Sequence, residues 1–422
     1  MELYNRSLNV IPGASQTFSK SALVHVLGAT PLFLENGQGC HVTDVDGNKY
    51  VDFILGLMPV ILGYQDPDVN EAITSQLNKG ITFSLSTELE ILLAEKLVSL
   101  IPCAEMARFG KNGSDATTAA IRLARAYTGK SKVVFCGYHG WHDWYIGATS
   151  RNLGVPKEIQ ALSFACPFND IDALNAILEQ NNDTAAVILE PESSCSPAPN
   201  YLKQVRELSQ RHNAVLIFDE IVTGFRCNMG GAQKKYSVTP DLACFGKAMA
   251  NGMPISAVVG KKDIMKLMDD IFFSATFGGE ALSLAAAIAT INKIEQLDGP
   301  YHLHQRGRLL RNDISSLLKT TELHNMFLLI GPDWWPRIAY NTEAKIPRGI
   351  AISLLRQELV EQGILMGGTF NLCLAHDNDD IHKTVVAAWR NALEKVADHC
   401  SRSDPSSFLR GRPIQPVFQI RN

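Results

Sequence analysis

The sequence predicts an α/β protein built on a mostly parallel sheet with helices on both faces. Two observations lead to this fold class. Between about residues 107 and 300, short runs rich in β-branched residues recur, and helical stretches separate them. The runs are continuously apolar, as strands are when both of their faces are buried. Strands that alternate with helices along the chain usually pair in parallel.

The elements of this central region can be placed in chain order. A short apolar piece, a Gly-rich turn and a helix account for "ARFGKNGSDATTAAIRLARAYTG", residues 107–129. The strand-like runs that follow are KVVFC (132–136), AAVILE (185–190), AVLIFDE (214–220) and SAVVG (256–260), and helices are expected at 170–180 and 201–212.

The N-terminal part, residues 1–60, is expected to be a separate segment with a β-hairpin or meander. Residues 32–55 alternate apolar and polar side chains around two turn signals, Asn36-Gly37 and Asp46-Gly47. Periodic patterns predict helices over 68–79 and 88–100, the second with leucines along one side.

The C-terminal part, residues 301–422, is expected to form a smaller α+β domain followed by a tail. Helical patterns cover 301–319, 348–362 and 379–398, and an apolar strand-like run covers 325–330. The final residues are polar and Pro-rich, which favours an extended tail.

Composition excludes several classes of partner. The chain has 422 residues, of which 46% are hydrophobic, enough for a large core. Its 39 basic and 43 acidic residues leave a net charge of −4, so neither nucleic acid nor an anionic membrane is expected as a partner. The longest apolar run, residues 54–63, is too short to span a bilayer, and the first residues lack a signal-peptide layout. Nine scattered cysteines without C-x-x-C indicate reduced thiols, so we expect a cytoplasmic protein.

The stretch "GKNGSDATTAA", from Gly110, places glycines and a hydroxyl just before a helix. Backbone N–H groups at a helix N-terminus bind phosphate, Gly113 allows close approach, and the hydroxyl of Ser114 can donate a hydrogen bond. An ordinary helix N-cap would give the same pattern. Nucleotide motifs fit less well, because the chain has no G-x-G-x-x-G and no complete Walker loop.

The loop "FCGYHGWHDW", residues 135–144, gathers aromatic side chains after a strand. Such side chains can stack on a planar ring. His139 and His142 have no third ligand nearby, so no metal is expected. Core packing is the simpler interpretation of Trp141 and Trp144.

Two strand-like runs end in carboxylates, one at Glu190 and one at Asp219. In an open α/β sheet, sites lie beyond the carboxyl ends of strands. A carboxylate at the end of a buried strand needs a cationic partner. The pyridinium nitrogen of pyridoxal phosphate (PLP) is one candidate, and a structural salt bridge is the other.

The stretch "DLACFGKAMANGMP", residues 241–254, holds Lys247 among apolar neighbours. Desolvation disfavours the charged form of an amine and lowers its pKa. A neutral lysine amine is a nucleophile that forms Schiff bases with aldehydes such as PLP. A helix-end lysine that extends into water is the alternative.

Together these motifs resemble the class III, fold-type I, PLP-dependent aminotransferases, and within them the glutamate-1-semialdehyde 2,1-aminomutase branch. The resemblance covers nearly the whole chain. Its motifs, in order, are VIPGASQTF, TPLFLENGQGCHVTDVDGNKYVDF, NGSDATTAAIRLARAYTG, GYHGWHD, ILEP, IFDEIVTGFR, FGKAMANGMP and LAHDNDDIHKT. It implies a large PLP-binding domain over residues 61–300, with a mostly parallel seven-stranded sheet flanked by helices, and a smaller α+β domain made from the N- and C-terminal segments.

The resemblance also implies the catalytic residues. Lys247 would form the Schiff base with PLP, and Asp219 would pair with the pyridine nitrogen. Glu190 falls in the E-P motif that lies near the cofactor in this family.

The remaining cofactor contacts are implied in the same way. Gly113 and Ser114 would hold the phosphate, Tyr138 would stack on one face of the ring, and Ile221 would pack on the other. Thr276 matches the hydroxyl that such enzymes lend to the phosphate of the neighbouring subunit. A homodimer with a shared phosphate site is therefore expected.

The sequence departs from the aminomutase pattern at positions that would meet substrate. Leu57 stands where the motif S-W-G-P has Trp, and Gly368 stands where a Glu is expected near the C-terminal motif. Cys195 replaces an Asn, Thr17 aligns with a Ser, and Lys20 aligns with an Arg. The cofactor contacts are retained whereas the substrate contacts are changed.

We therefore expect an aminotransferase that moves nitrogen from a small-molecule amino donor to a carbonyl acceptor, such as a keto- or aldehydo-sugar. The aminomutase reaction is the alternative, and the two differ in whether a second substrate is needed. A non-catalytic or nucleotide-binding α/β protein is the third possibility. The absence of nucleotide motifs and the presence of both Lys247 and Asp219 disfavour it.

Overall fold

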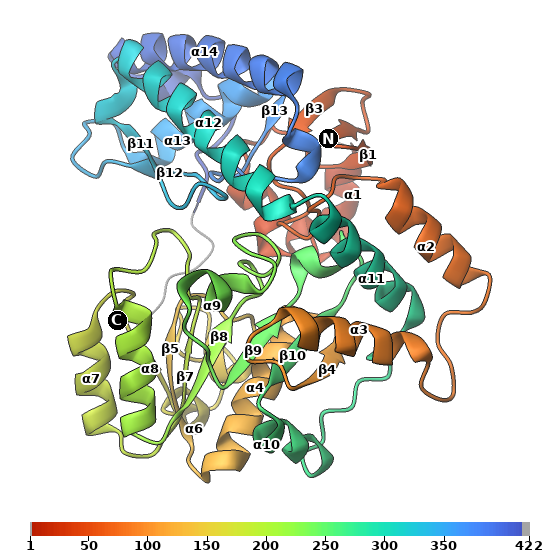
Figure 1. Cartoon of the computed structure of the whole chain (residues 1–422). Coiled ribbons are helices and arrows are strands. Elements are labelled where there is room, and N and C mark those ends of the chain that lie inside the picture. The colour runs from red at the N-terminus through yellow and green to blue at the C-terminus, as the bar shows by residue number, and fades with distance from the viewer. Residues whose placement is uncertain (1, 416–422) are drawn as a thin grey trace. The chain divides into compact units, whose positions relative to one another are not determined.

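The chain folds into two compact units in a computed structural model that describes residues 2–415 (Figure 1). Unit 1 combines the residues up to Asp66 with those from Tyr301 onward, and unit 2 comprises Pro67–Pro300. In the described part of the chain, no helix has the length and apolar character needed to cross a membrane.

Unit 2 is built on a seven-stranded sheet in the order β4-β10-β9-β8-β7-β5-β6. β5 to β9 run parallel to one another, and β10 runs antiparallel to β4 and β9. The strands are β4 (Met106–Gly110), β5 (Lys132–Cys136), β6 (Ser163–Ala165), β7 (Thr184–Leu189), β8 (Val215–Asp219), β9 (Leu242–Phe245) and β10 (Ser256–Gly260).

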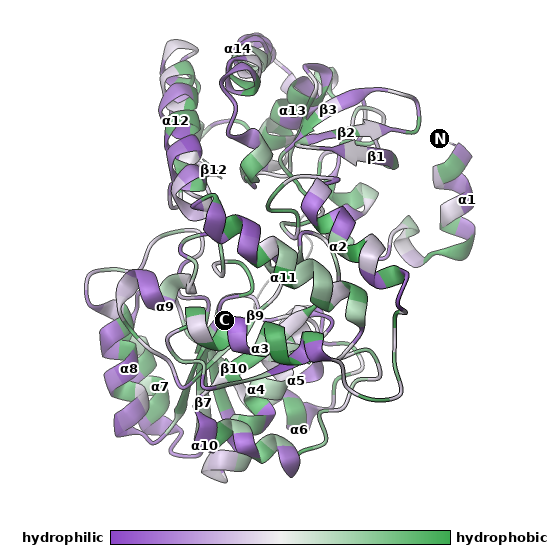
Figure 2. Ribbon diagram, turned by 45° about the vertical axis from the view of Figure 1, so that its right-hand side comes forward, coloured by the Kyte–Doolittle hydropathy of each residue, from purple (hydrophilic) through white to green (hydrophobic). Residues whose placement is uncertain are grey.

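Helices cover both faces of this sheet, which explains why its strands are continuously apolar. Helix α4 (Gly113–Thr128) packs on one face, against alternate strand residues such as Val133, Phe135 and Ile217. The intervening strand residues are also buried, and α7 (Ile171–Gln180) and α8 (Tyr201–Arg211) pack there. Figure 2 shows that α8 mixes hydrophobic and hydrophilic residues, as expected for a helix with one buried side.

Other helices of unit 2 surround this core. Helix α11 (Ala281–Gln296) packs against α2 (Pro67–Leu77) and α3 (Glu88–Leu100). The shorter ones are α5 (Asp143–Ile146), α6 (Lys157–Gln160), α9 (Gly231–Tyr236) and α10 (Lys262–Met265). The predicted fold class, a mostly parallel seven-stranded sheet flanked by helices, is confirmed.

Unit 1 contains a four-stranded sheet in the order β1-β2-β3-β13 and a separate antiparallel pair, β11 and β12. Its elements are α1 (Glu2–Val10), β1 (Leu34–Gln38), β2 (His41–Asp44), β3 (Lys49–Asp52), α12 (Gly299–Thr320), β11 (Phe327–Ile330), β12 (Arg337–Tyr340), α13 (Arg348–Glu361), β13 (Ile364–Leu365) and α14 (Asp379–Ser401).

One of the two turn signals predicted in the N-terminal meander is wrong. Asn36 and Gly37 lie inside β1 rather than in a turn, and the chain reverses after Gln38 instead. A Cβ at Gly37 would lie 2.7 Å from the ring of Tyr64, so this glycine serves close packing. Gly47, in contrast, has φ +87° in the turn between β2 and β3, as the second signal predicted.

The expected extended tail is packed along α13 as far as the structure describes it. The backbone N–H of Arg410 donates to the side chain of Gln357, and that of Ile414 donates to Ser353 Oγ. Part of the predicted tail, residues 416–422, lies outside the described residues.

Candidate active site

The site is built where three adjacent parallel strands end. Asp219 is the last residue of β8, Glu190 directly follows β7, and Lys247 lies two residues beyond β9. Because β7, β8 and β9 are neighbours in the sheet and run in the same direction, their carboxyl ends meet at one edge. The topology thus brings together the amine and the two carboxylates that the sequence singled out.

Asp219 is buried, and both of its carboxylate oxygens have partners. Oδ1 accepts a hydrogen bond from the backbone N–H of Ile221 at 3.1 Å. Oδ2 lies 2.8 Å from Nδ1 of His139, which is itself buried. A structural partner for Asp219 therefore exists, and it is a histidine rather than a lysine or arginine.

His139 is held so that both of its ring nitrogens face oxygen atoms. Its Nε2 lies 3.2 Å from the carbonyl oxygen of Cys136, which can only accept a hydrogen bond. Nδ1 faces the carboxylate of Asp219. These two contacts fix the orientation of the His139 ring against the Asp219 carboxylate.

The contact of His139 with Asp219 was not predicted from the sequence, where His139 was weighed only as a metal ligand. Among the described residues, no group of three or more His, Cys, Asp or Glu side chains could hold a metal ion. The signal available in the sequence was a histidine three residues beyond a buried strand. Its partner is 80 positions away, which no local pattern can reveal.

Lys247 lies in the environment that its neighbours predicted. Burial lowers the pKa of its amine, and the nearby Asp219 and Glu190 oppose that effect, while Arg226 adds to it. Lys247 also has φ +37°, in a region that favours glycine. The preceding Gly246 is closely packed, since a Cβ there would lie 3.1 Å from Ile221 Cδ1.

Glu190 is a second carboxylate near the same amine. Burial raises its pKa, and the charge of Asp219 raises it further. Its Oε2 accepts the backbone N–H of Tyr138 at 3.1 Å. Gly137 has φ +110°, and a side chain there would collide with the Glu190 carboxylate, so the loop before Tyr138 depends on that glycine.

The N-terminus of α4 has the character of an anion site. The carboxylate of Asp115 accepts the N–H groups of Lys111 and Asn112. Within the described chain, the next two N–H groups, those of Gly113 and Ser114, donate to no protein acceptor. Two backbone donors at the start of a 16-residue helix are therefore available to an anion.

The aromatic loop closes over this helix end. Ser114 Oγ accepts the backbone N–H of Trp141 at 3.3 Å, and Gly140 allows the approach because a side chain there would collide with Ser114. Trp144 is buried, as expected, whereas Trp141 is 66% exposed and does not pack in the core. The expectation of core packing was wrong for Trp141.

Ile221 and Tyr138, the two residues expected to pack on the cofactor ring, both lie beside the carboxylates of the cluster. Ile221 lies between two glycines, since a Cβ at Gly113 would be 3.3 Å from it and one at Gly246 would be 3.1 Å away. Tyr138 is half-exposed, and burial together with Asp219 and Glu190 raises the pKa of its hydroxyl. Both residues therefore adjoin the groups that lie around Lys247.

Thr276 is also a predicted cofactor residue, but in the described structure no hydrogen bond joins it to this cluster. It lies exposed in the turn before α11. The N-terminus of α11 does not offer free N–H groups, because Glu280 accepts those of Leu282 and Ser283 and pairs with Lys111. Any anion contact must therefore come from the Thr276 hydroxyl itself.

The second carboxylate at the end of the β8 run, Glu220, is structural. It accepts the backbone N–H groups of Ala232 and Gln233 and the hydroxyl of Thr223. These contacts fix the segment between β8 and α9. Although the two residues are adjacent, Asp219 lies in the cluster around Lys247, whereas Glu220 holds the backbone that follows β8.

These side chains fit PLP. The cofactor has an aldehyde, a ring nitrogen and a phosphate, and the site offers an amine of lowered pKa, a buried carboxylate and unpaired backbone N–H groups. Close packing of Ile221 against two glycines leaves an apolar surface for a planar ring. Each of these protein groups is chemically compatible with the part of the cofactor that it would contact.

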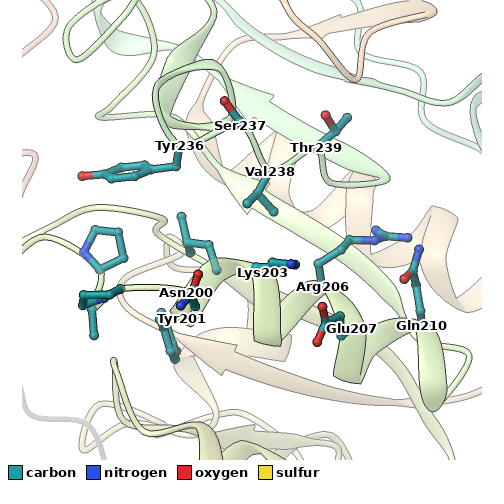
Figure 3. A pocket seen from close by; sticks show the side chains of 14 residues that line it. Asn200, Tyr201, Lys203, Arg206, Glu207, Gln210, Tyr236, Ser237, Val238 and Thr239 are labelled. Carbon is teal, nitrogen blue, oxygen red and sulfur yellow. The ribbon is translucent and has the colours of Figure 1, made fainter.

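A different cavity in unit 2, of about 590 Å³, lies elsewhere (Figure 3). It is lined by residues 197–203 and by residues of α8 and the α9–β9 connection, including Arg206 and Tyr236. None of the expected cofactor residues lines it, so this cavity is separate from the cluster around Lys247.

We predict that Lys247 is more reactive than other lysines. Since burial lowers its pKa, the neutral amine is present at lower pH, and in cofactor-free protein its acetylation should begin at lower pH than that of the exposed Lys262. Mass spectrometry of peptides labelled across a pH series measures both. In the holoenzyme, borohydride should fix the pyridoxyl group on Lys247, and a label on another lysine would contradict the assignment.

We predict that the Asp219–His139 contact supports turnover. Asp219→Ala should lose at least about 100-fold in kcat with the fold retained, because Asp219 is expected to contact the ring nitrogen and control its charge. His139→Phe should lose about 10-fold or more, since it removes the partner of Asp219. His142→Phe is the matched control in the same loop. Near-normal kcat for a folded Asp219→Ala protein would refute the role.

Comparisons with known proteins agree with this geometry. The family model "Aminotransferase class-III" matches residues 25–327. The 3-aminobutyryl-CoA aminotransferase of Cloacimonas acidaminovorans (strain Evry) is 38% identical over 408 residues, covering 94% of this chain and 97% of that protein. A glutamate-1-semialdehyde 2,1-aminomutase of Syntrophobacter fumaroxidans is 33% identical over 435 residues, covering 94% and 98%.

Solved structures give the same answer for fold and cofactor. The FumI protein of Sphingopyxis sp. MTA144, in its PLP internal aldimine form, has a TM-score of 0.89 at 26% identity and covers 97% of this chain and 99% of that one. A transaminase with PLP bound has a TM-score of 0.86 at 26% identity, with 94% and 97% covered. The cofactor is PLP, the fold is fold-type I, and this chain belongs to the class III aminotransferases.

Proposed function

We propose that this enzyme moves an amino group between two separate molecules, an amino donor and a carbonyl acceptor. The observation that carries the proposal is the buried amine of Lys247 beside Asp219 and Glu190, at the shared carboxyl edge of three strands. Every residue of this cluster lies in unit 2. PLP, when bound, supplies an aldehyde that exchanges with amines and a ring that accepts electrons.

Each residue has a definite task in this proposal. The Lys247 amine holds the cofactor and, when displaced by substrate, carries a proton between two carbon atoms, for which its lowered pKa is suited. Asp219 holds a proton at the ring nitrogen, and His139 keeps the carboxylate oriented. Gly113 and Ser114 bind the phosphate through N–H groups, and Glu190 positions the Tyr138 loop.

Transfer between two molecules is favoured over the mutase reaction by the changed substrate positions. A mutase must keep one small intermediate bound during the whole reaction. The aromatic and acidic side chains expected for this binding are replaced here by Leu57 and Gly368. A lost polar contact to substrate costs on the order of 1–3 kcal/mol. The relative from Cloacimonas, similar over almost its full length, bears the name of an aminotransferase.

The acceptor is a carbonyl compound of biosynthesis, such as a keto- or aldehydo-sugar. An acyl thioester is a second substrate class to test, because 3-aminobutyryl-CoA stands in the name of the Cloacimonas relative. Glutamate 1-semialdehyde is the substrate of the alternative reaction, supported by the relatives named as aminomutases.

We predict that the pyridoxamine form of the enzyme regenerates its aldehyde form when a second carbonyl compound is supplied. Stopped-flow absorbance with panels of keto and aldehydo compounds and 3-oxoacyl thioesters measures the rate. Lys247→Ala should bind cofactor without turnover, and Lys262→Ala should behave as the parent. Rapid conversion of glutamate 1-semialdehyde to 5-aminolevulinate, with no other compound preferred, would restore the mutase assignment.

We also propose a homodimer in which Thr276 reaches the phosphate held by the partner chain. Large apolar side chains on both sides of Thr276 are exposed in the single chain, Phe272 at 85% and Phe277 at 56%, and Leu85 is 85% exposed. Such side chains on one chain are typical of a covered interface.

We predict that Thr276→Ala weakens PLP binding about 10-fold, whereas the exposed control Thr239→Ala does not. Light scattering should give a dimer mass. Mixed dimers of Thr276→Ala and Lys247→Ala chains contain one site with both residues intact, so one of the two sites in each mixed dimer should regain tight binding. A monomer, or no restoration on mixing, would contradict the shared site.

A further inference from the structure

Unit 1 contains a cavity of about 230 Å³ that is lined by three arginines, Arg337, Arg348 and Arg356. No aspartate or glutamate is among the described residues that line it. The cavity is smaller than those that enclose whole drug-sized ligands, and it suits one charged group of a larger molecule. None of the residues assigned to the cofactor lies in this unit.

The arginines converge because of local structure. Arg348 begins α13, and Arg356 follows eight residues later, with Ile352 between them, so all three line the cavity from one side of the helix. Arg337 begins β12, and its guanidinium lies over the ring of Trp335, 4.9 Å from the centroid.

Arg356 is the arginine that most lacks a counter-charge. Its Nη1 donates to the carbonyl oxygen of Val24 at 2.8 Å, while its buried Nε has no hydrogen-bond partner among the described residues. Neither Arg356 nor Arg348 has a carboxylate within 4 Å in the described structure. Burial, followed by the charge of Arg348, lowers the pKa of Arg356 to about 10. A buried donor of this kind calls for an acceptor.

Two glycines keep the space beside Arg356 open. Gly368 has φ +143°, and a Cβ there would lie 3.1 Å from Nη2 of Arg356. Gly367 faces open space, with nothing within 4 Å of a built Cβ. Both glycines line the cavity, so a side chain at Gly368 would meet the guanidinium group of Arg356 and one at Gly367 would take up open space.

We propose that this cavity binds an oxyanion group, a phosphate or a carboxylate, through Arg348, Arg356 and Arg337. Guanidinium groups donate paired hydrogen bonds that match the planar or tetrahedral oxygens of such groups. The ligand supplies a counter-charge for Arg348 and Arg356, and Nη2 of Arg356, which lies beside Gly368, can donate to it. The assignment does not depend on which amino-transfer reaction the enzyme performs.

The test is isothermal titration of the PLP-loaded enzyme, in a buffer without oxyanions, with inorganic phosphate, succinate and coenzyme A in separate runs. The variants are Arg356→Met, Arg348→Gln and Gly367→Val, the last of which fills the cavity and leaves every arginine in place. Arg390→Gln, an exposed arginine of α14 outside the cavity, is the matched control. Circular dichroism and cofactor absorbance show that each variant is folded.

We expect saturable binding that weakens about 10-fold or more in Arg356→Met and in Gly367→Val, weakens less in the exposed Arg348→Gln, and is unchanged in Arg390→Gln. Tightest binding of coenzyme A assigns the group to a thioester substrate, tightest binding of succinate to a carboxylate substrate, and binding of phosphate alone to the free anion. Absence of saturable binding by all three probes, or equal binding in Gly367→Val and the parent, would overturn the proposal.

Discussion

The carboxylate of Asp219, buried at the end of β8, is the constraint from which most of the site follows. A buried charge must be paired and hydrogen-bonded. One oxygen takes the N–H of Ile221, which turns the chain immediately after the strand. The other takes His139, and His139 can reach it only if the loop after β5 folds back across the sheet edge.

That loop is in turn fixed by several close contacts. The hydroxyl of Thr117 on α4 donates to the carbonyl oxygen of His139 at 3.0 Å, which links the loop to the first turns of that helix. Gly137 and Gly140 have positive φ and admit Glu190 and Ser114, respectively. A single buried carboxylate is therefore linked to the groups proposed for the ring, the amine and the phosphate.

Much of the sheet and of the cluster around Lys247 could be predicted from the sequence, because short local patterns indicate the strands and the residues at their ends. Two strands, β5 and β10, have the bounds of their apolar runs, since continuous β-branched residues between turns define a buried strand. Lys247 and Asp219 could be paired because strand ends share one edge of a parallel sheet. The turn predicted at Asn36-Gly37 is wrong because the sequence does not distinguish a glycine that makes room for the Tyr64 ring from a glycine in a turn.

Contacts over long sequence separations could not be predicted. The His139–Asp219 pair and the arginine cavity depend on side chains brought together by the fold. The exposure of Trp141 also depends on how its loop lies, and aromatic content alone suggested burial. The role of Thr276 depends on a second chain, which the sequence of one chain indicates only through resemblance.

The most direct test of the account is the ¹⁵N chemical shift of the ring nitrogen in enzyme loaded with ¹⁵N-labelled PLP, for the parent, Asp219→Ala and His139→Phe proteins. We expect a protonated nitrogen in the parent at neutral pH, loss of that proton in Asp219→Ala, and a retained proton in His139→Phe, which leaves the carboxylate in place. A protonated nitrogen that is unchanged in Asp219→Ala would contradict it.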